Sequence, residues 1–142
     1  MVNPLLILPL LNSSLAAGPF CWHQDPHSQP QRVTLDYRQC RAAITDLKIS
    51  ARQALRTPLT FGRSSDVGFE VPKTWDHGKC HVTIDMTRSD VMETTTFATI
   101  LEQAIDINLA CVSKPPFLGG EVSVGDHHLI KLSIHGDGTG ML

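Results

Sequence analysis

The chain has 142 residues, of which 42% are hydrophobic and 18% charged, and its formal net charge at pH 7 is −2. This length suits one domain with a modest apolar core. The near-neutral charge and the scattered Lys and Arg residues argue against electrostatic binding to nucleic acid. No stretch beyond the N-terminal segment is apolar over the ~20 residues that a membrane helix needs, so we expect no membrane insertion.

The N-terminal segment MVNPLLILPLLNSSLAAGPF has the pattern of a secretory signal. Pro4–Leu11 has the length of a signal-peptide core. Ser14 and Ala16 are small residues at the two positions that signal peptidase reads, which predicts cleavage after residue 16 or 17. The segment has no Lys or Arg, and a buried strand is the alternative, although its prolines would interrupt one. We expect residues 1–17 to be a signal peptide and the protein to be secreted and extracellular.

Four cysteines follow this segment, namely Cys21, Cys40, Cys80 and Cys111. An even number of cysteines in a secreted chain predicts two disulfides. None of them forms a C-x-x-C pair, which argues against a zinc knuckle or a thioredoxin-like redox motif.

The first half of the mature chain predicts one helix between short strands. Residues 18–31 contain three prolines and are expected to form an extended, irregular arm, followed by a strand at 32–36. Asp36 is a favourable N-cap for a helix whose apolar residues recur at helical spacing and which ends before Pro58. A second strand is expected at 59–63. Residues 64–79 are expected to form a long loop, in which Trp75 packs against the edge of the core.

The second half predicts a strand, a helix and a hairpin. Cys80–Met86 alternates, so its odd-numbered residues should face away from the core. Asp90 and Glu93 favour a helix start there, although the threonines at 94–96 weaken its first turns. Gly119-Gly120 should open the hairpin, with a two-residue turn at Gly125-Asp126 and a last strand at 127–135.

This order of elements predicts the α+β class. We expect a four-stranded antiparallel sheet with two helices on one face, a split β-α-β or ferredoxin-like sandwich with a C-terminal hairpin, over residues 32–136. Residues 137–142 would be a flexible tail. In that arrangement Cys40, in the first helical turn, lies beside Cys80 at the start of the third strand. Cys21 would then pair with Cys111. Four cysteines allow three pairings, and the arrangement favours this one.

Three local motifs carry a resemblance. They are Cys40-Arg41-Ala42-Ala43-Ile44, the pattern Pro-x-x-Trp-x-x-Gly-x-Cys at 72–80, and Cys111-Val112 followed by Gly119-Gly120. The chain resembles a loose group of small secreted fungal proteins with four cysteines. Some members are effector candidates of plant-associated fungi, and some share the α/β-sandwich of virally encoded killer toxins. The resemblance implies that fold and a secreted role, and it carries no catalytic residues.

The histidines and carboxylates do not form a recognisable reactive motif. His127 and His128 are adjacent and on a strand would point to opposite faces, and a disulfide would remove the Cys80 sulfur as a metal ligand. We therefore expect no metal and no cofactor. His81 and Asp85 share one strand face, but an ordinary polar sheet face explains them better than acid–base catalysis does. No nucleophile elbow, phosphate loop or H-E-x-x-H helix is present, and we expect no catalytic residues.

An open polar sheet face could instead bind a partner. The candidate surface comprises His81, Thr83, Asp85 and Lys131, together with Ser133. Trp22 could add an aromatic anchor, or it could pack beside the Cys21 disulfide.

These observations favour an effector-like or toxin-like secreted protein that binds an unidentified extracellular or host macromolecule without catalysis. The alternatives are a small hydrolase or glycan-modifying enzyme and a cell-wall-associated structural protein. The sequence does not predict the oligomeric state.

Overall fold

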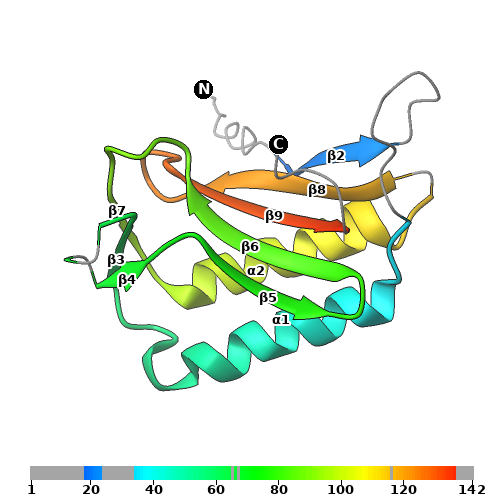
Figure 1. Ribbon diagram of the computed structural model, residues 1–142, viewed down its shortest axis with the longest axis horizontal. Coiled ribbons are helices and arrows are strands. Elements are labelled where there is room, and N and C mark those ends of the chain that lie inside the picture. Colours follow the sequence, from blue (N-terminus) through cyan, green and yellow to red (C-terminus); the bar gives the residue numbers. More distant parts are fainter. Residues whose placement is uncertain (1–17, 24–33, 65, 67, 116, 137–142) are drawn as a thin grey trace, which may run out of the picture.

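The computed structural model describes residues 18–23, 34–64, 66, 68–115 and 117–136 (Figure 1). These residues form a mixed α+β fold with sheets of five and three strands, two α-helices and two disulfides. The expected signal peptide at 1–17, most of the expected arm and the expected tail at 137–142 lie outside the described residues. No helix in the described ranges has the length and apolar character needed to cross a membrane.

The helical segments are α1 (Tyr37–Ala51), the 3-10 turn η2 (Arg52–Ala54), α2 (Phe97–Ile107) and the π-helical η3 (Asn108–Val112). The strands are β2 (Phe20–His23), β3 (Leu59–Gly62), β4 (Phe69–Glu70), β5 (Lys73–His77), β6 (Cys80–Met86), β7 (Glu93–Thr95), β8 (Phe117–Val124) and β9 (Ile130–Gly136).

The main sheet has the strand order β2-β8-β9-β6-β5 and is antiparallel throughout. Both helices cover the same face, with α1 over β5 and β6 and α2 over β8 and β9 (Figure 1). The register places Val82 opposite Ile134 and Ile84 opposite Leu132. All four side chains are fully buried, so the hydrophobic core lies between the central strands and the two helices.

The first helix forms as the sequence predicts. The Asp36 side chain accepts the backbone N–H of Arg38 at 2.7 Å, which caps the helix. The buried residues recur on one face of α1, at Cys40, Ala43, Ile44, Leu47 and Ala51. The expected helix and its N-cap are confirmed.

The second helix begins later than expected, because its predicted first turn is a strand. Thr96 is the N-cap, and its hydroxyl accepts the N–H of Thr99 at 3.2 Å. Glu93–Thr95 instead forms β7 and pairs with β3. The β-branched threonines favour an extended backbone, and this preference outweighs the acidic residues that indicated a helix start.

The predicted four-strand arrangement is wrong in three places. Residues 34–36, the described part of the strand expected at 32–36, are irregular. The strand expected at 59–63 forms as β3, but it belongs to the small sheet β4-β3-β7. The segment read as a loop, 64–79, contains β4 and β5, and β5 is an edge of the main sheet. The main sheet therefore has five strands, and it lacks the parallel pair of a split β-α-β unit.

The C-terminal hairpin forms, but with a different turn. Gly119 and Gly120 lie inside β8, and residues 125–129 connect β8 to β9 in place of a two-residue turn. His127 and His128 are therefore in a loop and not on a strand. Gly119 has φ +104, and a Cβ atom there would come within 2.2 Å of the Ile134 carbonyl oxygen. The close approach of β9 therefore requires glycine at this position.

Both disulfides join the predicted partners. Cys40–Cys80 connects the first turn of α1 to the start of β6. Cys21–Cys111 connects β2 to η3. The arm residues that carry Cys21 are not irregular, since residues 20–23 pair with β8 as an edge strand.

Candidate functional site

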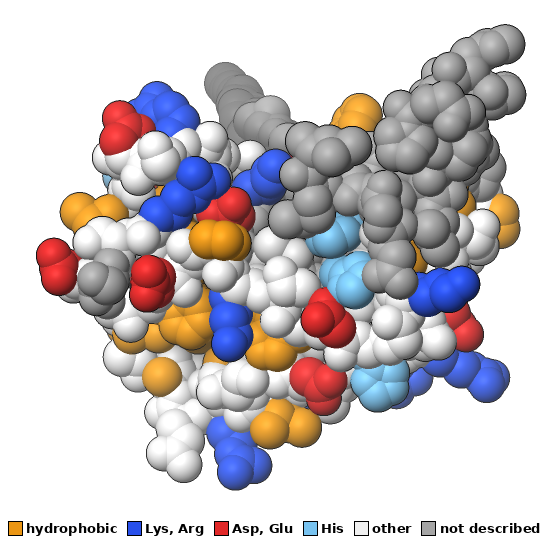
Figure 2. All heavy atoms as spheres, in the orientation of Figure 1, with side chains coloured by type: hydrophobic (Ala, Val, Ile, Leu, Met, Phe, Trp, Pro, Cys, Tyr) orange, Lys and Arg blue, Asp and Glu red, His pale blue; other side chains and the backbone are white. Residues whose placement is uncertain are grey.

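The predicted binding surface lies on the face of the main sheet that the helices leave open. The register between β6 and β9 places His81 opposite His135, Thr83 opposite Ser133 and Asp85 opposite Lys131. Histidine and acidic side chains gather over these strands (Figure 2). The sequence therefore identified correctly which of these residues share a face. The centre of this face is not open as expected, because Thr83, Ser133 and His135 are only 2%, 6% and 4% exposed.

The polar groups at the centre of this face bind one another. The Thr83 hydroxyl lies 2.9 Å from the Thr74 hydroxyl and 3.1 Å from Nε2 of His135. Nδ1 of His81 is hydrogen-bonded to the Asp76 carboxylate, and the His81 and His135 rings are 5.3 Å apart. Because these groups satisfy one another, they stabilise the buried face of the sheet and have less capacity to bind a partner.

Asp85 connects the small sheet to the main sheet. Its two carboxylate oxygens each accept a hydrogen bond of 3.0 Å from the Arg63 guanidinium, which follows β3. The backbone N–H of Met86 donates to the same carboxylate at 2.7 Å. The hydrogen bonds that Arg63 donates to Asp85, together with the negative charge of Asp85, raise the pKa of the Arg63 guanidinium. Asp85 therefore has a structural partner, and it does not act on His81.

The remaining members of the predicted surface lie towards its margin. Lys131 is half-buried opposite Asp85. Trp22 is half-buried on β2, next to the disulfide-bonded Cys21. Phe20, two residues earlier on the same strand, is 65% exposed and was not among the predicted residues. The aromatic side chain that β2 presents most openly is therefore Phe20.

A hydroxyl and an imidazole within hydrogen-bond distance form the basic unit of a nucleophile–base pair, and Thr83 with His135 has this geometry. Only 2% of Thr83 is exposed, so a substrate cannot approach its hydroxyl. Within the described part of the chain, no group of three or more His, Cys, Asp or Glu side chains is arranged to hold a metal ion.

The buried carboxylate Glu93 holds the loop between β8 and β9. It accepts the backbone N–H groups of His127 and Leu129 at 3.2 and 3.1 Å, and Nδ1 of His127 lies 3.1 Å from it. Burial acts to raise the pKa of Glu93, but the hydrogen bonds from His127 and Leu129 and the charge of His127 lower the pKa below its ordinary value. Glu93 is therefore ionised and fixes the loop to β7.

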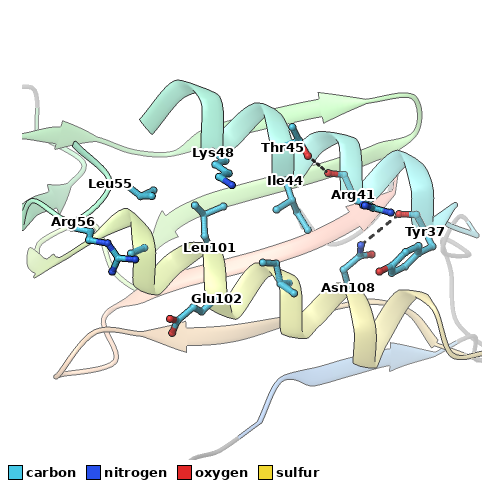
Figure 3. A pocket seen from close by; sticks show the side chains of 12 residues that line it. Tyr37, Arg41, Ile44, Thr45, Lys48, Leu55, Arg56, Leu101, Glu102 and Asn108 are labelled. Carbon is cyan, nitrogen blue, oxygen red and sulfur yellow. Dashed lines mark hydrogen bonds between the residues drawn. The ribbon is translucent and has the colours of Figure 1, made fainter. Parts of the chain in front are cut away.

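The helical layer contains a groove that the sequence did not reveal. It lies between α1 and α2, has a volume of about 640 Å³ and is shown in Figure 3. Its apolar lining comes from both helices and from the segment after η2, and includes Ile44, Leu55, Leu101 and Ile105. Arg41, Lys48 and Arg56 supply three positive charges, whereas Glu102 is the one carboxylate among the described lining residues.

The three cationic side chains are exposed and have no partner among the residues that the structure describes. No hydrogen bond or ion pair joins the side chain of Arg41, Lys48 or Arg56 to any other described residue. Figure 3 shows Lys48 extending from α1 towards Leu101 of α2. Because such side chains retain their full capacity for pairing, this groove has a stronger potential for binding an anion than the sheet face has.

One end of the groove carries a buried polar atom that has no partner in the described ranges. Asn108 is only 3% exposed, and its Nδ2 donates a long hydrogen bond of 3.5 Å to the Tyr37 carbonyl oxygen. No donor among the described residues reaches its Oδ1. A buried acceptor without a donor costs roughly 1–3 kcal/mol, so this position is not optimised for stability alone.

Comparison of the chain with protein-family models, with curated proteins and with solved structures finds no match. The function must therefore be inferred from the chain's own geometry. Two sequence features could have indicated the groove. Arg41 and Lys48 are seven residues apart, which places them on one helix face, and Ile105 is an apolar residue outside the buried stripe of α2.

Proposed function

We propose that this protein is secreted and effector-like or toxin-like, and that it binds a host or competitor macromolecule without catalysis. Two disulfides that use all four cysteines support an extracellular location, because such bonds are typical of extracellular proteins. The similarity of its cysteine motifs to the four-cysteine secreted fungal proteins, including those with the killer toxin-like sandwich, belongs to this proposal. The cleavage of residues 1–17 is part of the same proposal.

The observation that carries the binding role is the contrast between the two faces of the molecule. On the sheet face, the polar groups that could perform chemistry are buried or paired with one another. On the helical face, three cations that pair with no other described side chain border an apolar groove. Grooves with an apolar lining and a few polar groups are common binding sites, so we place the contact surface there.

A photo-crosslinking experiment tests this role. The oxidised mature protein carries a photoreactive amino acid in place of Thr45, which is exposed and lines the groove. We expect one saturable crosslinked partner, which unlabelled protein displaces. The double variant Arg41→Glu/Lys48→Glu should compete at least about tenfold less well, which corresponds to about 1.4 kcal/mol.

The matched control makes the same change of charge elsewhere. Arg38 and Lys79 are exposed and lie outside the groove lining. Arg38→Glu/Lys79→Glu should therefore compete as well as the unmodified protein does. Equal competition by both double variants would show that the groove is not the contact surface. Turnover of a glycan, peptide or ester substrate by the purified protein would contradict the non-catalytic role.

A further inference from the structure

We propose that the occupant of the groove is an acidic amphipathic helix of the partner protein. This inference rests on the proposed binding function and names the chemistry of the partner. Helices α1 and α2 lie side by side and run in opposite directions (Figure 1). A third helix can lie along the furrow between two such helices and place its apolar side chains at positions i, i+3, i+4 and i+7 against the lining.

The spacing of the cations favours a helix with several carboxylates. Arg41 and Lys48 are seven residues apart on α1, which is two helical turns or about 10.5 Å along the axis. Carboxylates at i+1 and i+8 of a partner helix repeat the same interval at the edge of its apolar face, so one partner helix can pair with both cations. Arg56 extends the row beyond η2. A ligand with a single negative charge, such as a fatty acid, would engage only one of these groups.

The apolar part of the groove completes the match to an amphipathic partner. Ile105 lines the groove and is 48% exposed, although it is a large hydrophobic residue. The aliphatic stems of Arg41 and Lys48 widen the apolar area on the opposite wall. An occupant with leucines along one face would bury this surface, whereas a purely polar anion would leave Ile105 in water.

The Tyr37 end of the groove provides a second, independent feature. Asn108 lies there with its buried Oδ1 lacking a donor from the described residues, and Tyr37 lies beside it (Figure 3). The first turn of any helix carries backbone N–H groups without intrahelical acceptors. Because Asn108 Oδ1 is itself buried, the donors of a partner helix would reach it only if this end of the groove opened beside Tyr37. Binding would then disturb Tyr37, which is the chain's single tyrosine.

The single tyrosine allows a direct test with the oxidised mature protein labelled with 3-fluorotyrosine. The probe is a synthetic amphipathic peptide of about 15 residues with Leu at i, i+3, i+4 and i+7 and Glu at i+1 and i+8. Two further probes are titrated in the same way. A scrambled peptide of the same composition tests whether the helical arrangement matters, and vesicles containing an anionic phospholipid test for a lipid surface in place of a peptide. Titration calorimetry gives the affinity, and the 19F resonance reports on Tyr37.

We expect the amphipathic peptide to bind at least about tenfold more tightly than the scrambled peptide and to shift the 19F resonance saturably. The affinity should fall as salt rises, because exposed charges are screened. Arg41→Glu/Lys48→Glu should weaken binding at least about tenfold, while Arg38→Glu/Lys79→Glu should leave it within about twofold. The neutral pair Arg41→Gln/Lys48→Gln should also weaken binding, and it replaces the Glu variant if that variant does not fold.

Equal affinity for the amphipathic and scrambled peptides would overturn this inference. It would also be overturned if the vesicles shifted the 19F resonance of Tyr37 and the amphipathic peptide did not. The crosslinking experiment separates this outcome from the broader proposal. If Thr45 still crosslinks a partner through the groove while the peptide does not bind, the groove binds a partner of different chemistry. If neither is observed, both proposals fail.

Discussion

Replacing Glu93 by Gln should loosen the connection between the small sheet and the β8–β9 loop. The Glu93 carboxylate is 5% exposed and serves three donors, which are the backbone N–H groups of His127 and Leu129 and the His127 ring. Glutamine has one acceptor oxygen in place of two. Its amide N–H group would face the N–H donors of His127 or Leu129, which cannot accept a hydrogen bond from it. At least one of the three hydrogen bonds must therefore be lost.

The size of this effect follows from the charge and the burial. A hydrogen bond to a charged group contributes about 1.5–3 kcal/mol. Because His127 is exposed, water can replace part of the hydrogen bonding that its ring loses in the variant. We expect the free energy of unfolding to fall by about 2 kcal/mol. For a domain of this size that corresponds to a decrease in Tm of about 8 °C.

The pH dependence gives a more specific test. The folded pKa of Glu93 is lowered, so its contribution to stability is present above the unfolded pKa and is lost as pH falls through the folded pKa. The stability difference between the wild type and Glu93→Gln should therefore be complete near neutral pH and should shrink below about pH 4.3. Urea unfolding at about pH 6 and about pH 3 measures this difference. Glu70→Gln, which changes an exposed carboxylate on β4, is the control. The same stability difference at both pH values would contradict the conclusion that Glu93 acts as a hydrogen-bonded carboxylate.

Three further predictions concern the scaffold. Replacing Cys40 and Cys80 together by Ala opens a bridge between residues 40 apart, so the free energy of unfolding should fall by about 4 kcal/mol, and a loss below about 1 kcal/mol in urea would contradict this. Gly120→Ala would place a Cβ atom 2.5 Å from a β2 carbonyl oxygen and 2.8 Å from Cys111 Sγ. Disulfide mapping by mass spectrometry should then show incomplete oxidation of Cys111, whereas full oxidation would count against the close approach. Asn108→Leu removes a buried acceptor without a donor, so Tm should stay the same or rise, and a decrease of more than about 4 °C would show that the amide is structurally required.

The features that the sequence predicted correctly depend on local patterns. Asp36 and the spacing of the apolar residues determine α1, and strict alternation determines β6. The pairing of Cys40 with Cys80 was predicted correctly although the strand expected at 32–36 is not seen in its described part. The prediction succeeded because the N-terminus of the helix and the start of the strand meet at one end of the sheet, whatever precedes the helix.

The strands that the sequence missed depend on tertiary contacts. In β5 only Trp75 is buried, so no alternation indicates a strand, and the turn-forming residues around it indicated a loop. Trp75 does seal the edge of the core as predicted, and its Nε1 donates to the Ser50 hydroxyl of α1 at 3.0 Å. Pairing with β6 and contact with α1 therefore produce β5, and neither contact can be read from the segment alone.

The candidate site shows the same limit. Alternation in β6 identified His81, Thr83 and Asp85 as one face, but it could not show that Arg63 comes from the small sheet to pair with Asp85. The groove arises only when α1 and α2 pack side by side, because Lys48 and Leu101 are far apart in the chain. A polar helix face that reads as solvated can thus become one wall of a groove.

The disulfides and the groove are coupled through the same helix ends. Cys40 immediately precedes Arg41 in the first turn of α1, and Cys111 follows Asn108 by three residues in η3. Each disulfide therefore fastens one wall of the groove to the main sheet, and both do so at the end where Tyr37 and Asn108 lie. A disulfide restricts the relative positions of the segments it joins, so oxidation would preorganise this end of the groove as well as stabilise the fold. A surface arranged before binding loses less conformational entropy when its partner arrives. In the binding role proposed above, the covalent bonds therefore contribute to recognition as well as to stability.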